Sequence, residues 1–116
     1  MPQVSKRPLK GDVRDKMLGT LFESVLKISD EKIVRNFLED LFTPTEKIMI
    51  AKRLSAAFFL ERGYTYDAIG EMLKLSHTTI NTIRKPLLKS GEGYRAVFRL
   101  IEKSSKISPL LEKLDA

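Results

Sequence analysis

Residues 65–81 read Thr65-Tyr66-Asp67-Ala68-Ile69-Gly70-Glu71-Met72-Leu73-Lys74-Leu75-Ser76-His77-Thr78-Thr79-Ile80-Asn81, two short apolar-striped segments separated by a brief turn. The apolar spacing predicts one helix over about 66–73 and a second from about 77. Thr65 and Ser76 precede these segments, where a side-chain oxygen accepts from free backbone amides. Two helices that cross steeply need small residues at their closest approach, and we expect Ala68 and Gly70 there. The arrangement predicted is a helix-turn-helix.

The second helix of this motif is expected over about residues 77–85. Its buried stripe is Ile80, Ile83 and Leu87, and the core shared by the two helices adds Ile69, Leu73 and Leu75. Pro86 disfavours a helical Lys85 and removes a backbone donor, so a kink or an end is expected there. The opposite face is predicted to be exposed and carries His77, Thr78, Asn81, Thr82, Arg84 and Lys85.

The exposed face has the chemistry of a DNA recognition helix, whose first residues meet base edges in the major groove. Asn81 can pair with the edge of adenine, and the methyl group of Thr78 can touch thymine. His77 can donate to a base acceptor or to a phosphate. Cations near the helix end suit phosphates, which position the protein without specifying sequence. The predicted DNA contacts are Thr65, Tyr66, Ser76, His77, Thr78, Asn81, Thr82, Arg84, Lys85 and Lys89.

Each of these residues, taken singly, is explained as well by a solvated surface, and Arg84-Lys85 also complements the helix dipole. Taken together, the exposed polar and cationic residues and the charge distribution favour DNA binding. The formal net charge is +6, and no acidic residue lies between Met72 and Gly91. A second basic group, Lys6, Arg7, Lys10, Arg14 and Lys16, lies near the N-terminus, where a solvated arm is the alternative to a DNA contact.

The composition of the chain argues against several other classes of function. At 116 residues the chain fits one domain. It has no cysteine and a single histidine, so we expect no metal site and no cofactor. No apolar run approaches the ~20 residues that span a bilayer, so we expect a cytoplasmic protein without a membrane partner. No paired-carboxylate, nucleophile–base or phosphate-loop constellation occurs, which argues against an enzyme.

The rest of the chain predicts an all-α fold of five or six helices without a strand. Residues 1–11 are expected to form a flexible basic arm, residues 12–104 the helical domain, and residues 105–116 a tail in which Leu110, Leu111 and Leu114 form a turn or contact a partner chain. Apolar residues from Val13 to Val25 predict the first helix. Ser29-Asp30-Glu31 starts the second, whose stripe is Ile33, Val34, Phe37, Leu38 and Leu41. After a loop Ser90-Gly91-Glu92-Gly93, a last helix is expected over residues 94–103.

The third helix is unusually apolar. Thr43-Pro44-Thr45-Glu46 is a capping box with proline at the first helical position, and Gly63 is placed to end the helix after Arg62. Between them, apolar residues leave little of the circumference polar: Ile48, Met49, Ile50, Ala51, Leu54, Ala56, Ala57, Phe58, Phe59 and Leu60. Such a helix must be covered on several sides. We favour coverage by a second subunit; the alternative is a central helix wrapped by its own chain.

Several segments resemble the Trp repressor superfamily, in particular its Trp repressor-like bacterial members. They are Phe42-Thr43-Pro44-Thr45-Glu46, Lys52-Arg53-Leu54, Glu61-Arg62-Gly63, Tyr64-Thr65-Tyr66-Asp67-Ala68-Ile69 and Gly91-Glu92-Gly93-Tyr94, within about residues 13–103. The resemblance implies an intertwined homodimer with two recognition helices spaced for successive major grooves. It also implies a transcriptional regulator, usually a repressor.

The resemblance also implies candidate effector contacts. In the repressor, bound tryptophan orients the recognition helices, and of the residues that hold it Thr43 and Arg53 match here. The second arginine of that clamp aligns with Thr82, so half of the polar clamp is missing and a tryptophan co-repressor is not expected. An ordinary ion pair on a long helix explains Arg53 as well. Lys74 stands where many such motifs carry a glycine, which a non-glycine residue replaces at modest cost.

Three hypotheses follow. The first is a dimeric, sequence-specific regulator that binds double-stranded DNA, with an effector that the sequence does not identify. The second is a protein-interaction module that keeps the helical scaffold, and the third is a non-specific nucleoid-type DNA binder. Sequence selectivity separates the first from the third, and dependence on Thr78 and Asn81 separates the first from the second.

Overall fold

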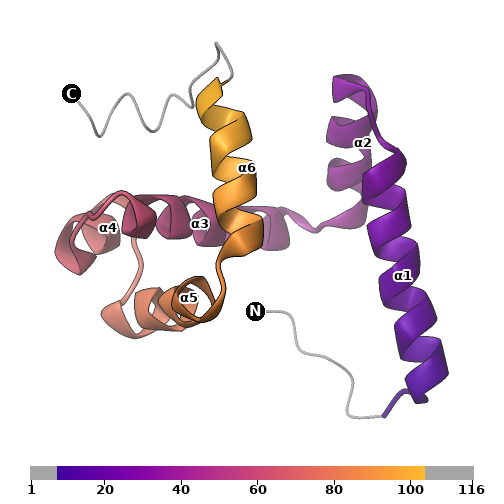
Figure 1. Ribbon diagram of the computed structural model, residues 1–116, viewed down its shortest axis with the longest axis horizontal. Helices are drawn as coiled ribbons and strands as arrows, with labels where there is room; N and C mark the ends of the chain where they lie inside the picture. The colour runs from indigo at the N-terminus through magenta and orange to yellow at the C-terminus, as the bar shows by residue number, and fades with distance from the viewer. Residues whose placement is uncertain (1–7, 104–116) are drawn as a thin grey trace. The chain divides into compact units, whose positions relative to one another are not determined.

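The computed structural model describes residues 8–103, which form six helices and no strand (Figure 1). The helices are α1 (Gly11–Lys27), α2 (Glu31–Leu41), α3 (Pro44–Glu61), α4 (Tyr66–Leu73), α5 (His77–Lys89) and α6 (Glu92–Lys103). The all-α prediction is therefore confirmed for the described part of the chain. The described residues divide into two compact units, one that ends at Ile50 and one that begins at Ala51. The boundary lies within α3, and each unit is described by itself.

The first unit contains α1, α2 and the start of α3. As predicted, Asp30 caps the start of α2, and its Oδ1 accepts from the backbone N–H groups of Lys32 (2.7 Å) and Ile33 (3.3 Å). No residue of α1 or α2 is buried. Between the two helices lies a hollow of about 480 Å³, lined by Leu21, Phe22, Val25, Leu26, Phe37, Leu38, Leu41 and Phe42. The apolar stripes of both helices thus face one open surface.

The predicted capping box opens α3. Thr43 Oγ1 accepts from the backbone N–H of Glu46 at 3.1 Å, and Glu46 Oε1 accepts from the backbone N–H of Thr43 at 2.9 Å. The helix ends at Glu61, one residue earlier than predicted, and Gly63 follows in a left-handed conformation with φ of +87°. Glycine adopts that conformation without the steric penalty of a Cβ.

The second unit holds the hydrophobic core. Phe58 and Phe59 of α3 pack among side chains from the three helices that follow, and the ring of Phe58 meets that of Phe98 edge-on at 4.9 Å between centroids. Such a pair contributes about 0.5–1.5 kcal/mol beyond its buried area. The buried core cluster is Ala56, Ala57, Phe58, Phe59, Ile69, Leu73, Ile80, Ile83 and Phe98. All four helices of this unit therefore share one core.

α5 runs through Pro86 to Lys89, so of the two expectations for Lys85, a kink or an end, the end is not observed. Proline removes the donor to the carbonyl four residues earlier. The turn that follows is nevertheless held in place, because Leu87 is buried and Arg95 of α6 reaches back to the helix end. Its guanidinium donates to the carbonyl oxygens of Leu87 (3.1 Å) and Ser90 (2.6 Å).

α6 begins at Glu92, so only Ser90 and Gly91 connect it to α5. The predicted loop over residues 90–93 is too long by two residues. Gly91 makes the short connection possible, because its φ is +64° and a Cβ there would lie 2.5 Å from the carbonyl oxygen of Leu87. No other residue fits that position without moving the backbone.

The predicted arm and tail fall largely outside the described residues. Lys6 and Arg7 of the basic group lie there, as does the whole of residues 105–116 with Leu110, Leu111 and Leu114. Gly11 belongs to α1 rather than to an arm. None of the helices within residues 8–103 is both long and apolar enough to span a bilayer.

Candidate DNA interface

The α4–α5 pair forms the predicted helix-turn-helix, with both predicted caps in place. Thr65 Oγ1 accepts from the backbone N–H of Ala68, and Ser76 Oγ accepts from that of Thr79, each at 3.1 Å. Between the helices Lys74 takes the left-handed conformation, with φ of 57°. This is the turn position at which many such motifs carry a glycine. The sharp turn at Lys74 directs the chain from α4 into α5.

Gly70 marks the closest approach between α4 and the turn. A Cβ at this position would lie 2.8 Å from the carbonyl oxygen of Leu75, while the backbone N–H of Leu75 donates to the carbonyl of Gly70 at 3.1 Å. The expectation for Gly70 is confirmed. That for Ala68 is wrong, since Ala68 is exposed. The face of α4 that packs inward is the one carrying Ile69, which leaves Ala68 on the outside.

The buried and exposed faces of α5 separate as predicted. Ile80, Ile83 and Leu87 are buried, whereas Leu75 of the turn is only half-buried. Every predicted contact residue of this helix is exposed, namely His77, Thr78, Asn81, Thr82, Arg84, Lys85 and Lys89. The helix therefore offers a continuous polar and cationic surface supported from behind by the core.

Tyr66, at the start of α4, joins three side chains of α5. Its hydroxyl donates to Asn81 Oδ1 at 3.2 Å and accepts from Arg84 Nη1 at 3.4 Å. The guanidinium of Arg84 lies 5.9 Å from the centre of the Tyr66 ring, and the His77 ring meets that ring edge-on at 5.7 Å. The sequence placed Tyr66 among the DNA contacts but gave no sign that it organises the others.

His77 has a partner that the sequence analysis missed. Its Nε2 lies 2.8 Å from Oδ1 of Asp67. The side chains of both residues are exposed, and pairs of this kind contribute only about 0–1 kcal/mol. The stretch without acidic residues that contains α5 begins at Met72, after Asp67. Only the crossing of the two helices brings Asp67, ten positions earlier than His77, onto the same surface.

Ser76 and Thr82, like Tyr66, use their hydroxyl hydrogens within the motif. Ser76 Oγ donates to Thr79 Oγ1 at 2.9 Å, and Thr82 Oγ1 donates to the carbonyl oxygen of Thr78 at 3.1 Å. Their oxygens remain acceptors, which a phosphate cannot use. Ser76 is thus chiefly a cap. The Asn81 amide and the cationic side chains of α5 carry N–H donors on the exposed face.

A guanidinium from α6 fixes the far end of α5. Arg95 Nε lies 3.1 Å from Glu61 Oε2 at the end of α3, while the same group holds the carbonyls of Leu87 and Ser90. The last carbonyls of a helix lack intrahelical donors, and a cation there is also favoured by the helix dipole. Arg95 was not singled out from the sequence, since its partners lie five to 34 positions away.

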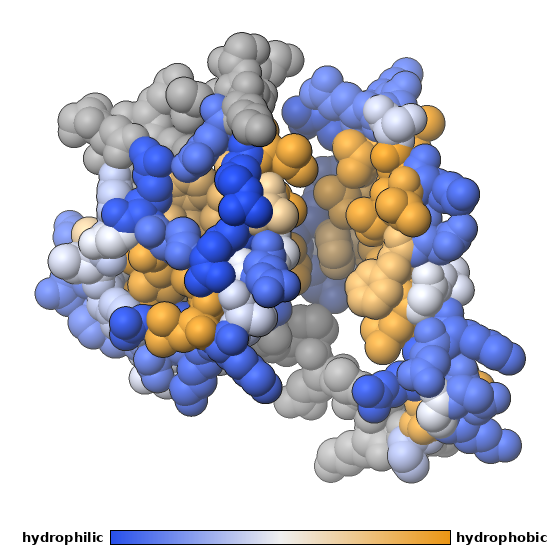
Figure 2. Space-filling view, in the orientation of Figure 1, coloured by the Kyte–Doolittle hydropathy of each residue, from blue (hydrophilic) through white to orange (hydrophobic). Residues whose placement is uncertain are grey.

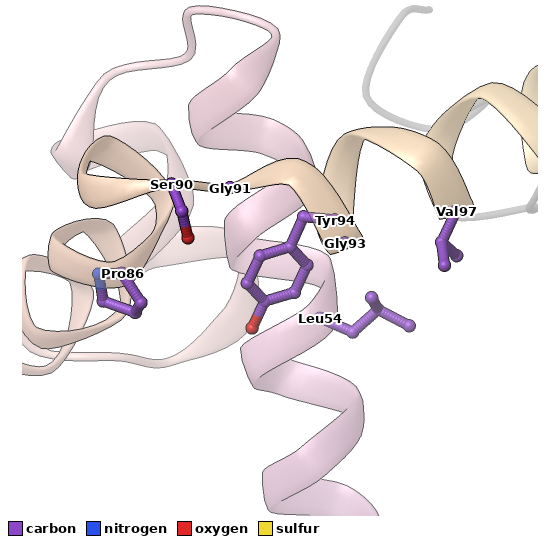
Figure 3. A pocket seen from close by; sticks show the side chains of 7 residues that line it. All are labelled: Leu54, Pro86, Ser90, Gly91, Gly93, Tyr94 and Val97. Carbon is purple, nitrogen blue, oxygen red and sulfur yellow. The ribbon is translucent and has the colours of Figure 1, made fainter. Parts of the chain in front are cut away.

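The two effector candidates lie in different units. Thr43 uses its hydroxyl oxygen in the capping box of α3, and Arg53 is half-buried farther along that helix. A separate hollow of about 450 Å³ in the second unit is lined by Leu54, Pro86, Ser90, Gly91, Gly93, Tyr94 and Val97 (Figure 3). Its lining carries no charged side chain, and neither Thr43 nor Arg53 is part of it.

Comparisons with known proteins agree on one family. The family described as Trp repressor protein matches residues 16–102. The chain is 33% identical over 82 residues to the uncharacterized protein YerC of Bacillus subtilis (strain 168), an alignment that covers 71% of this chain and 79% of that protein. No solved structure matches significantly.

Proposed function

The chain belongs to the Trp repressor family, and from this premise we propose that it is a dimeric transcriptional regulator that binds specific double-stranded DNA sites. Membership in that family and the helical fold suggest a DNA-binding regulator, not an enzyme. The more specific proposal rests on the surface of α5. We take repression, in which the bound protein blocks access to DNA, as its mode of action, and the cytoplasm as its place of action.

The observation that carries the proposal is the two-sided character of α5. Its inner face is locked into the core by Ile80, Ile83 and Leu87, which are at most 7% exposed, so the helix is a rigid support. Its outer face begins with side chains that reach base edges and ends with cations. A recognition helix enters the major groove with its N-terminal residues against the bases. Thr78 and Asn81 occupy that place in α5.

Phosphate contacts follow from the charge distribution on the same face. Lys85 and Lys89 are exposed near the end of α5, where they meet the DNA backbone once the helix start enters the groove. Neutralising each phosphate releases counterions, so affinity falls steeply with salt concentration. These contacts orient the protein on the duplex and leave sequence selection to the residues at the helix start.

The open apolar surface of the first unit supports a homodimer. Figure 2 shows hydrophobic side chains gathered along α1 and α2. Phe22 is 67% exposed and Leu26 is 79% exposed, and in α3 Ile48 is 59% exposed. Monomeric proteins rarely leave a contiguous surface of this kind in water. We propose that a second copy covers it, which provides two recognition helices for two half-sites.

We propose further that tryptophan does not control this protein through the clamp of its family. The position that would supply the second arginine is Thr82, whose hydroxyl donates to the carbonyl of Thr78 instead. A hydroxyl cannot replace a guanidinium that binds a carboxylate through two parallel hydrogen bonds. Added L-tryptophan should therefore leave the melting temperature unchanged, and a saturable rise would contradict this point.

Selection of bound sites from random duplexes tests the function. The expected result is a palindromic site whose half-sites lie about one helical turn, 10–10.5 base pairs, apart. The variant Thr78→Ala with Asn81→Ala should keep the fold and lose the selection, because both residues are exposed. Unselective binding by the unmodified protein would favour a nucleoid-type role, and no binding would favour an interaction module.

A further inference from the structure

We propose that Tyr66 is a positioning residue that sets which base Asn81 selects. This inference rests on the proposed function, since it assigns a determinant of specificity to the same surface. Tyr66 belongs to α4 and Asn81 to α5, so the contact between them bridges the two helices of the motif. A tyrosine at this place can therefore control the orientation of an amide that faces the DNA.

The direction of the hydrogen bonds around Tyr66 is set by Arg84. A guanidinium has donors and no acceptor, so the Tyr66 hydroxyl oxygen accepts from Arg84 Nη1 at 3.4 Å. The hydroxyl hydrogen is then left to donate, and Asn81 Oδ1 lies 3.2 Å away. Successive hydrogen bonds in such a chain polarise and strengthen one another. Arg84 and Tyr66 together hold the carbonyl side of the Asn81 amide.

The ring of Tyr66 is itself held in place. The guanidinium of Arg84 lies over one face at 5.9 Å, and the ring of His77 meets it edge-on at 5.7 Å. His77 Nε2 in turn lies 2.8 Å from Asp67 Oδ1. Both neighbours restrict the rotamers open to Tyr66, so its hydroxyl has a defined position before any DNA arrives. Preorganisation of this kind lowers the entropy cost of forming a specific contact.

The chemical consequence concerns the two edges of the Asn81 amide. Tyr66 occupies one of the two lone pairs of Asn81 Oδ1 and so competes with an adenine N6–H donor, whereas the amide nitrogen keeps both of its N–H donors for DNA. Adenine needs both a donor and an acceptor from asparagine, whereas guanine presents two acceptors, N7 and O6, in the major groove. The arrangement around Tyr66 therefore favours guanine over adenine at the base that Asn81 meets. This replaces the sequence-based expectation that Asn81 pairs with adenine.

The test is the base preference of Tyr66→Phe, measured by selection from random duplexes and by binding constants for matched sites. Asn81→Ala first identifies the base that Asn81 contacts, because the base preference should be lost at that position of the selected site and at no other. At that position the unmodified protein should prefer guanine. Tyr66→Phe removes one hydroxyl, frees Asn81 Oδ1, and should shift the guanine-to-adenine ratio toward adenine by about 5- to 150-fold, the range carried by a bidentate base contact.

Two controls separate positioning from stability. Tyr94→Phe removes a hydroxyl from a tyrosine that stacks on Phe98 in the same unit, and its base preference should match that of the unmodified protein. In an Asn81→Ala background, Tyr66→Phe should cause no further change at the identified position. A thermal unfolding curve for each variant reports whether the fold persists.

The outcomes are distinct. If the unmodified protein shows no sequence preference, the proposed function fails and this inference falls with it. If it is selective but Tyr66→Phe keeps the same preference at every position, or weakens all sites equally, the function stands and the role of Tyr66 is overturned. A change confined to the position that Asn81→Ala identifies supports it.

Discussion

Replacing Gly70 with alanine perturbs the closest approach inside the helix-turn-helix. The added Cβ would lie 2.8 Å from the carbonyl oxygen of Leu75, whereas ordinary contacts begin at 3.4 Å. The atom it meets is backbone, so no side chain can rotate away. Relief requires a shift of the turn that carries Ser76, the cap of α5. The substitution therefore has two effects: it strains the helix-turn-helix, and it displaces the start of the recognition helix.

The size of the effect follows from two opposing contributions. Forcing an extra group into a packed site costs about 1–3 kcal/mol. Alanine in place of glycine in a helix returns about 0.8–1.0 kcal/mol through propensity. A net loss in unfolding free energy of about 1 kcal/mol corresponds to a fall in melting temperature of about 4–8 °C for a domain of this size. DNA affinity should fall as well, because the shifted turn displaces the first residues of α5, which are proposed to contact the bases.

Thermal unfolding followed by circular dichroism, at one fixed protein concentration, measures this effect. Gly93→Ala is the matched control, since Gly93 lies in α6 and a Cβ there meets no atom within 4 Å. The control should melt at or slightly above the temperature of the unmodified protein. A Gly70→Ala variant that melts as high as the unmodified protein, with undiminished DNA affinity, would refute the tight approach.

Three further substitutions probe the same unit. Lys74→Gly should raise the unfolding free energy by about 0.5–1 kcal/mol, measured by urea denaturation, because glycine adopts the left-handed conformation without strain. Arg95→Met should lower it by about 1–3 kcal/mol, since α5 loses charge-assisted partners for its last carbonyls. Asp67→Asn should tighten DNA binding by about twofold to fivefold at low salt in fluorescence anisotropy, because it removes an exposed anion beside His77.

Each of these has a control on the same element or at the same position. Lys74→Ala keeps a Cβ in the left-handed turn, so equal stability of the glycine and alanine variants would contradict the strain argument. Arg99→Met removes an exposed arginine from α6, and a loss as large as that of Arg95→Met would show that general charge is responsible. Glu71→Gln removes an exposed acid elsewhere on α4, and an equal gain in affinity would deny Asp67 a local effect.

Local signals in the sequence predicted most of the helices. The capping box at Thr43, and Asp30, Thr65 and Ser76 at three other helix starts, were found from residue type and spacing because these contacts span two or three positions. The buried stripe of α5 was found for the same reason, because apolar residues on one face of a helix recur about once per turn.

The errors share a physical cause, which is that tertiary contacts override local preference. Pro86 favours a kink or an end in α5, but Leu87 in the core and Arg95 from the next helix hold the following turn. The contacts of Tyr66 with Asn81 and Arg84 span 15 and 18 positions, so no pattern within one helix reveals them. Sequence periodicity identified which residues face outward, and only the crossing of α4 and α5 shows which of them act together.

Recognition of DNA sequence by α5 is tested by the ratio of dissociation constants for a selected site and for a scrambled duplex of equal length and composition. Fluorescence anisotropy at about 150 mM salt gives both, with the scrambled duplex reporting the electrostatic contribution alone. The selected site should bind at least about 1,000-fold more tightly, as specific regulators do, and Thr78→Ala with Asn81→Ala should abolish most of this ratio. A ratio near one for the unmodified protein would contradict the claim that α5 recognises DNA sequence.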